Sequence, residues 1–201
     1  MPSKYNGSLT REQFMFREMR MVARMTLEGE TPEEIVRHVC EENLFQYPTN
    51  GEISSKCRAC LRRMQTLAQM PDLLSMLAEG AHTEARQAAL IAMMLQNALM
   101  AEFMTDVIGE KYRTADFAIT RADFNLFFLR LSQEDEGVAG WSDATVKKIK
   151  GVIRRCLWEA EYIADVRSEQ LLPVCVSEEL ARALREADLG RFLPAFNRFE
   201  D

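Results

Sequence analysis

The chain has few of the residues that catalytic and metal sites need. Only two of its 201 residues are histidine, His38 and His82, and neither is accompanied by a matching pattern of carboxylate and nucleophile. Glycine-rich phosphate loops, nucleophile elbows and the zinc-hydrolase helix motif do not occur in the sequence. We therefore expect a protein that is not an enzyme and that uses no cofactor, no metal ion and no small-molecule substrate.

Cysteine is also scarce. The five cysteines are an odd number and lack the paired spacing of a secreted disulfide framework, which favours reduced thiols in a cytoplasm. Cys57 and Cys60 have the C-x-x-C separation of a zinc or redox site, but no second pair follows them. Both fall on the apolar stripe of a predicted helix, so we interpret them as core thiols.

No apolar run is long enough to cross a membrane. The most apolar segment, Ala88 to Leu95, has eight residues, whereas a spanning helix needs about 20. Met1 to Gly7 lacks the basic and then apolar run of a secretory signal. These features predict a buried helix around Ala88 and a cytoplasmic protein without a membrane partner.

Positive charge is in deficit overall but is gathered in two places. Ser54 to Arg63 contains four basic residues and no acid, and Ser142 to Trp158 contains five basic residues and the single acid Asp143. Each stretch carries +4, so the remainder of the chain carries −14 against a total of −6. Charge segregated in this way predicts local binding of a polyanion by a surface that otherwise repels it.

Hydrophobic periodicity predicts an all-α fold, a compact multi-helix protein. Thr10 and Gln13 have capping-box spacing for a helix reaching Glu28, where Gly29 ends it. Further helix starts are predicted at Thr31, Thr49, Pro71, Thr83, Thr120, Ser142 and Ser177. The stretch from Thr83 to about Arg113 is predicted to be either one long helix or two helices with a break near Gln96 and Asn97. Short β-like runs at 163–166 and 171–174 predict a small carboxy-terminal wing.

This pattern predicts three regions along the chain. They are an amino-terminal helical lobe (1–80), central core helices (81–115) and a carboxy-terminal winged-helix-like lobe (116–201), which we expect to form one compact body. Each basic stretch is the second helix of a pair, after a shorter helical pattern and a polar loop. This order is typical of a helix-turn-helix, although both loops are longer than its usual tight turn.

Helix phase sets the cations apart from the apolar stripes, so we expect them to face outward. A helix in a DNA major groove needs small polar residues near its start for base edges and cations for phosphates. We predict base-facing positions at Ser54, Ser55, Lys56, Thr145 and Lys148, and phosphate-facing positions at Arg58, Arg62, Arg63, Lys147, Lys150, Arg154 and Arg155. The competing interpretation is an ordinary solvated helix face, and the two are about evenly matched.

The sequence resembles the BrxA family of bacteriophage exclusion (BREX) systems over nearly its full length. The resemblance rests on the segments Tyr5 to Ile35, Glu41 to Gln46 (EENLFQ), Lys111 to Thr114 (KYRT), Trp141 to Ile163 and Leu171 to Val174 (LLPV). These segments are patterns of packing and helix starts, and none is a catalytic signature.

The resemblance implies a cytoplasmic, non-enzymatic, all-helical accessory that binds double-stranded DNA through helix-turn-helix elements. It also implies service in a phage-defence system alongside other BREX subunits. The alternative function is a protein-interaction adaptor that scaffolds a defence complex without touching DNA.

Overall fold

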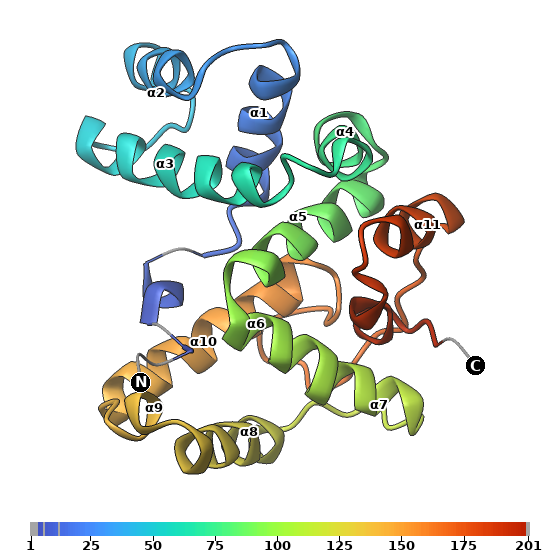
Figure 1. The fold of residues 1–201 in the computed structure, drawn as a ribbon. Coiled ribbons are helices and arrows are strands. Elements are labelled where there is room, and N and C mark those ends of the chain that lie inside the picture. The colour runs from blue at the N-terminus through green and yellow to red at the C-terminus, as the bar shows by residue number, and fades with distance from the viewer. Residues whose placement is uncertain (1–3, 6, 12, 200–201) are drawn as a thin grey trace. The chain divides into compact units, whose positions relative to one another are not determined.

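Helices make up the regular secondary structure of this chain. The computed structural model describes residues 4–5, 7–11 and 13–199 (Figure 1). In chain order the helices are η1 (Gly7–Thr10), α1 (Phe16–Leu27), α2 (Pro32–Glu41), α3 (Asn50–Thr66), α4 (Pro71–Glu79), α5 (His82–Gln96), α6 (Ala98–Glu102), the π-helical η2 (Phe103–Ile108), α7 (Gly109–Arg113), α8 (Arg121–Glu134), α9 (Glu136–Ala139), α10 (Asp143–Glu159), α11 (Glu178–Glu186) and η3 (Gly190–Phe196). No β-strand occurs in the described ranges, and the all-α prediction is confirmed.

Side-chain caps fix most helix starts. The Thr31 hydroxyl accepts a hydrogen bond from the Glu34 amide, and the Glu34 carboxylate accepts one from the Thr31 amide at 2.8 Å. Such a reciprocal pair satisfies amides that the first helical turn leaves without partners. Caps also form at the predicted residues Thr49, Thr120, Ser142 and Ser177.

The predicted start at Thr10 is wrong. Thr10 closes η1 instead, and its hydroxyl donates to the Gly7 carbonyl at 2.8 Å. Helix α1 begins only after Met15, whose backbone is left-handed with φ of 54°. At the other end, Gly29 has φ of 90°, a conformation that glycine adopts at low cost, and the chain turns there toward α2.

The chain divides into two compact units. Unit 2 is the continuous stretch Met15–Gln96, and unit 1 combines Met1–Phe14 with Asn97–Asp201. This division does not coincide with the three regions expected from the sequence, because α5 packs with α1, α3 and α4 in unit 2. The alternative with a break is confirmed at Asn97, whose backbone is extended and whose side-chain oxygen accepts from the Met100 amide at 3.0 Å.

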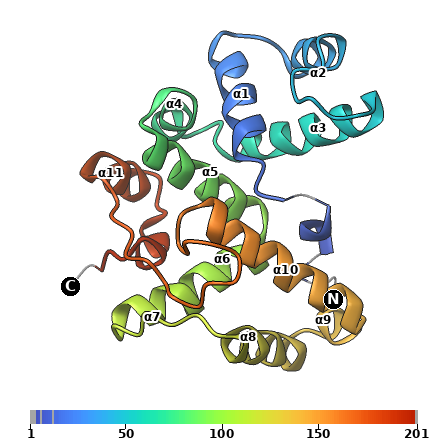
Figure 2. The ribbon, with the colours of Figure 1, turned by 180° about the vertical axis from the view of Figure 1, so that it is seen from behind.

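Unit 2 is built around helices α1, α3, α4 and α5, and α2 packs on α3 (Figures 1 and 2). Its core includes Met19, Ile53 and Leu77, each shielded from solvent. Cys57 and Cys60 are buried as predicted, and burial raises the pKa of both thiols to about 12. Thiols held so firmly in the protonated form are poor metal ligands and poor nucleophiles.

Unit 1 is organised by the helical run of α6, η2 and α7 (Figure 2). From this run Phe103 stacks on Phe124 of α8 with ring centroids 4.9 Å apart, and meets Phe127 edge-on at 5.1 Å. Gly109 lies against η3 so closely that an added Cβ atom would be 3.0 Å from the Cβ of Pro194. Glycine at this position therefore allows α7 and η3 to pack together.

A buried lysine links α7 to the start of α8. Lys111 is buried, and its Nζ lies 2.8 Å from Asp116 Oδ2 and 3.0 Å from Asp123 Oδ1. Burial disfavours the charged amine, but the hydrogen bonds to the two carboxylates outweigh it and raise the pKa of Lys111. Asp123 also completes the cap at Thr120, so one carboxylate serves both contacts.

The predicted wing does not form. Residues 163–176 contain turns and extended backbone but no paired strands. Instead this segment pairs with the chain before α8. Ala118 and Gln170 form an isolated antiparallel bridge, the Ile119 amide donates to the Glu169 carbonyl at 2.7 Å, and the Leu171 amide donates to the Phe117 carbonyl at 2.9 Å. Of the residues in the two β-like runs only Leu171 takes part in this contact, beside Glu169 and Gln170 of the polar segment between the runs.

Candidate nucleic-acid interface

Helix α10 presents part of its predicted basic row to solvent. Ser142 caps the helix by accepting from the Thr145 amide at 3.2 Å, and Lys147, Lys148 and Arg155 are exposed further along it. The side chains of Lys147 and Lys148 make no hydrogen bond or ion pair with the described part of the chain. Arg155 lies 3.9 Å from Glu159, with half of its side chain in solvent.

Gly151 lies within this exposed row. An added Cβ atom there would meet no heavy atom within 4 Å, so the protein's own packing does not demand a glycine. The face that carries Lys147, Lys148 and Arg155 is consequently flat at its centre. A flat, cationic helix face suits approach to a phosphate backbone.

Lys150 and Arg154 were predicted to share an exposed face with Lys147, but both are half-buried and are bonded to other parts of unit 1. Lys150 Nζ donates to Asn125 Oδ1 at 2.8 Å and lies over the Phe128 ring at 5.2 Å from its centroid. Burial, with a smaller effect from Arg121, lowers the pKa of Lys150.

Arg154 is held in a similar way. Its Nε donates to the Val166 carbonyl at 2.7 Å and its Nη2 to the Ser168 carbonyl at 2.8 Å. Its guanidinium also lies over the Phe124 ring. The reason is geometric: both side chains leave α10 on the flank that α8 and the 163–170 segment cover, and there they satisfy polar atoms of unit 1.

Helix α3 exposes a smaller set of the predicted residues. Ser55, Arg58 and Arg62 are exposed, whereas Ser54 and Lys56 are half-buried. Arg58 Nη1 donates to the Ser54 hydroxyl one turn earlier. The exposed cations of α3 are therefore Arg58 and Arg62, which are four residues apart and share one face of the helix.

Arg63 was predicted to face outward, toward phosphates, but it is buried. Only 1% of its surface is accessible, and Nε donates to Gln96 Oε1 at 3.1 Å while Nη1 lies 3.2 Å from the sulfur of Met19. The buried arc of α3 is wider than the predicted stripe because α1, α2 and α5 all pack against it. Arg63 stands at the border of the stripe and is included in the core.

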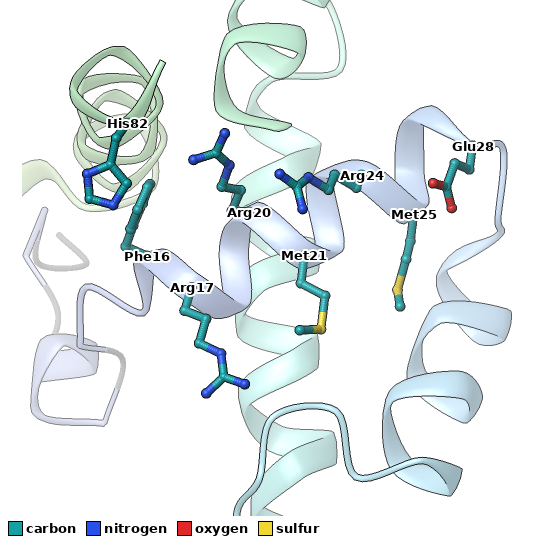
Figure 3. A pocket seen from close by; sticks show the side chains of 8 residues that line it. All are labelled: Phe16, Arg17, Arg20, Met21, Arg24, Met25, Glu28 and His82. Atoms are coloured by element: carbon teal, nitrogen blue, oxygen red, sulfur yellow. The ribbon is translucent and has the colours of Figure 1, made fainter. Parts of the chain in front are cut away.

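A further row of cations on α1 was missed. Arg17, Arg20 and Arg24 recur at helical spacing and line a cavity of about 540 Å³ with Phe16 and His82 (Figure 3). The spacing of these arginines is visible in the sequence, but Glu18 and Glu28 reduce their charge of +3 to a net +1 over residues 16–28.

The contacts of two of these arginines give the row a structural role. Arg20 Nη2 donates to the Gly80 carbonyl at 2.7 Å, and Arg24 Nε donates to the Ala78 carbonyl at 2.9 Å. These carbonyls are at the carboxyl end of α4, where unpaired acceptors and the helix dipole favour cations. In the view of Figure 3, Arg17 points downward, away from His82, whereas Arg20 points upward.

No group of three or more His, Cys, Asp and Glu side chains that could hold a metal ion occurs among the described residues. His38 lies 3.3 Å from Glu30 and 3.5 Å from Glu42 at the surface, and His82 packs edge-on against Phe16. In the same ranges, no helix has the length and apolar character to cross a bilayer.

Taken with the fold, these features define a class: an all-helical protein in which a basic helix follows a shorter one in each unit. Comparison with known sequences gives the family. A model of the BrxA family matches residues 3–188, and the chain belongs to that family.

Curated relatives carry the same family name. A BREX protein BrxA from Bacillus cereus (strain H3081.97) is 29% identical over 83% of this chain and 82% of its own length. Another, from Paramagnetospirillum magneticum (strain ATCC 700264 / AMB-1), is 27% identical over 91% of both chains. Each alignment covers most of both chains, so the similarity to these relatives includes residues of both units.

The fold also occurs in a solved structure. The crystal structure of an uncharacterized protein from Magnetospirillum magneticum aligns with a TM-score of 0.80, covering 96% of this chain and 98% of that one at 23% identity. The all-helical arrangement described above is therefore similar to an experimentally determined one.

Proposed function

We propose that this protein is a cytoplasmic, non-enzymatic component of a BREX phage-defence system that binds double-stranded DNA, mainly through phosphate contacts. Membership of the BrxA family supports the system. The observation that carries the DNA partner is the row of Lys147, Lys148 and Arg155 on the outer face of α10, in a chain whose net charge is −6. Cations kept together on an acidic protein favour a polyanionic partner.

The positions of the side chains on α10 suggest how the protein contacts a duplex. Lys147, Lys148 and Arg155 are placed to neutralise phosphates, while Thr145 lies near the helix start, where a groove-binding helix reaches base edges. Arg58 and Arg62 of α3 form a second, smaller phosphate-binding group, with Ser55 beside them. Because phosphate contacts carry no sequence information, little intrinsic sequence preference follows.

Salt titration tests this proposal. We expect the affinity for a duplex, measured by fluorescence anisotropy, to fall linearly on a log–log plot against salt, with a slope of about −0.9 for each neutralised phosphate. The three α10 cations alone give a slope of about −2.7. Two duplexes of unrelated sequence should bind with equal affinity. Absence of binding, or an affinity indifferent to salt, rejects the proposal.

An adaptor that scaffolds a defence complex is the second candidate. The observation that favours it is the acidic remainder of the chain, which carries −14 outside the two basic stretches and would repel DNA. In that case the basic helices meet acidic proteins and the salt titration with DNA is flat.

A further inference from the structure

Helix α8 is apolar on two opposite sides but is buried on only one. Phe124, Phe127, Phe128 and Leu131 face the core of unit 1. On the other side, Leu126 is 65% exposed and Leu129 is 54% exposed. On an ordinary surface helix the side opposite the buried stripe carries charged and polar residues. Single exposed leucines are common, but two that are neighbours on one helix face form the start of an interaction surface.

A groove adjoins this pair of leucines. It has a volume of about 340 Å³ between the η2–α7 run and α8, and its apolar lining includes Val107, Leu126 and Phe127. Leu126 belongs to both features, so the groove continues directly into the exposed leucine pair. We call the two together the α7–α8 surface. In both ribbon views α8 lies at the edge of unit 1 (Figures 1 and 2).

Carboxylates surround the groove. Asp106, Glu110, Asp116 and Asp123 line it together with only two cations, Lys111 and Arg130. Lys111 is shared between Asp116 and Asp123. Arg130 lies 2.8 Å from Asp106 and 4.0 Å from Glu102, and Glu134 also acts on it electrostatically. Arg113 adds a third cation at the edge, because its Nη1 lies 3.3 Å from Glu110 Oε2. Four lining carboxylates thus meet three cations, and the rim keeps a small excess of negative charge.

We propose that the α7–α8 surface binds an amphipathic helix of another protein, one with an apolar face for Leu126, Leu129 and the groove and with basic residues along its flanks. An apolar helix face that docks in a groove is a recurring mode of peptide recognition. The acidic rim selects the charge of the partner and steers its approach. This binding goes beyond the proposed DNA contact and does not depend on it.

The same rim argues against a second copy of this chain as the occupant. A two-fold pairing places a surface against itself, so Asp106, Glu110 and their counterparts would meet like charges. Juxtaposed like charges disfavour such a pair. A basic partner removes this repulsion and gains attraction from the same side chains.

The test uses the full chain and labelled peptides. A helical amphipathic peptide of Leu and Lys is compared with a Leu/Glu peptide of the same pattern and with a scrambled Leu/Lys peptide that has no apolar face. We expect the patterned Leu/Lys peptide to bind on the order of tenfold more tightly than either control, by anisotropy. Leu126→Ser/Leu129→Ser should lose on the order of tenfold in affinity, whereas Leu27→Ser, at a leucine that is 42% exposed in unit 2, should change nothing.

Two further measurements separate the alternatives. Glu110→Gln should weaken binding of the Leu/Lys peptide and reduce its salt dependence, while the DNA affinity of every variant stays at its original value. Equal binding of the three peptides, or no loss in the double leucine variant, overturns the proposal. Loss of a dimer in that variant, measured by sedimentation, also overturns it by assigning the surface to self-association.

Discussion

Arg62 and Arg63 are adjacent on α3 but lie in different environments: Arg62 is exposed, and Arg63 is buried with its Nε bonded to Gln96. The bond joins the late part of α3 to the last residue of α5 within unit 2. One arginine of the pair thus lies at the surface, while the other holds two helices together.

Replacing Arg63 should therefore cost stability. We expect Arg63→Ala to lower the free energy of unfolding by about 1–3 kcal/mol, because Gln96 and the surrounding core lose their partner. Arg62→Ala should stay within about 0.5 kcal/mol of the parent. Urea denaturation of both variants checks this, and equal stabilities would contradict the burial of Arg63.

Charge reversal on α10 should weaken DNA binding without unfolding the protein. Lys147→Glu/Lys148→Glu removes two exposed cations, and we expect a loss on the order of tenfold or more and a salt slope smaller by about 1.8. The matched control is Arg182→Glu/Arg185→Glu on α11, where the same charge change falls on arginines already near Glu186 and Glu178. If both variants lose equal affinity, net charge and not the α10 face governs binding.

The cluster of Lys111, Asp116 and Asp123 should make the stability of the fold depend on pH. Hydrogen bonds from Lys111 lower the pKa of Asp116; for Asp123 burial acts to raise the pKa, but bonds from Lys111 and Thr120 lower it overall. A carboxylate with a depressed pKa stabilises the fold above its unfolded pKa of about 3.9 and loses that contribution as pH falls through the folded value.

Lys111→Met should remove most of this acid dependence. Melting temperatures taken from neutral pH down to about pH 3 should fall steeply in the parent below about pH 4 and less steeply in the variant. The raised pKa of Lys111 gives the opposite sign at high pH: its stabilisation is complete below the unfolded value of about 10.4 and is lost as pH rises above it. Parallel acid curves for the two proteins would refute the coupling.

Two helical glycines should respond oppositely to the same substitution. Gly109→Ala pushes a Cβ atom to 3.0 Å from Pro194, whose ring is rigid, and we expect a destabilisation of about 1–3 kcal/mol. Gly151→Ala meets no neighbour and should stabilise α10 by up to about 1 kcal/mol. Thermal denaturation distinguishes the two variants. A stabilised Gly109→Ala variant would show that η3 shifts easily to make room for the added Cβ atom.

Local signals in the sequence predicted much of the fold. The sequence predicted the caps at Thr31 and Ser142 and offered the break near Asn97. These features are predictable because each capping side chain bonds to a backbone group within about four residues of it. The start at Thr10 failed because Met15 adopts a left-handed conformation that sequence spacing does not reveal.

The candidate interface was less predictable. Helix phase gives the direction of a side chain but not how many neighbours pack around the helix, so the burial of Arg63 needed the positions of α1 and α5. Lys150 and Arg154 are engaged by Asn125 and by carbonyls at Val166 and Ser168, contacts between segments remote in sequence. Lys147 and Lys148 were predictable because nothing in the described chain competes for them.

The interruption of unit 1 by the continuous unit 2 sets an order of events during synthesis. Residues Met15–Gln96 contain every helix of unit 2, so that unit is free to fold as soon as α5 has left the ribosome. The segment before it must wait, because Tyr5 donates to Glu102 at 2.7 Å and Lys4 donates through its backbone to Asp135 at 3.2 Å, both translated later. Lys4 and Tyr5 therefore reach their native partners only after the whole of unit 2 has been synthesised.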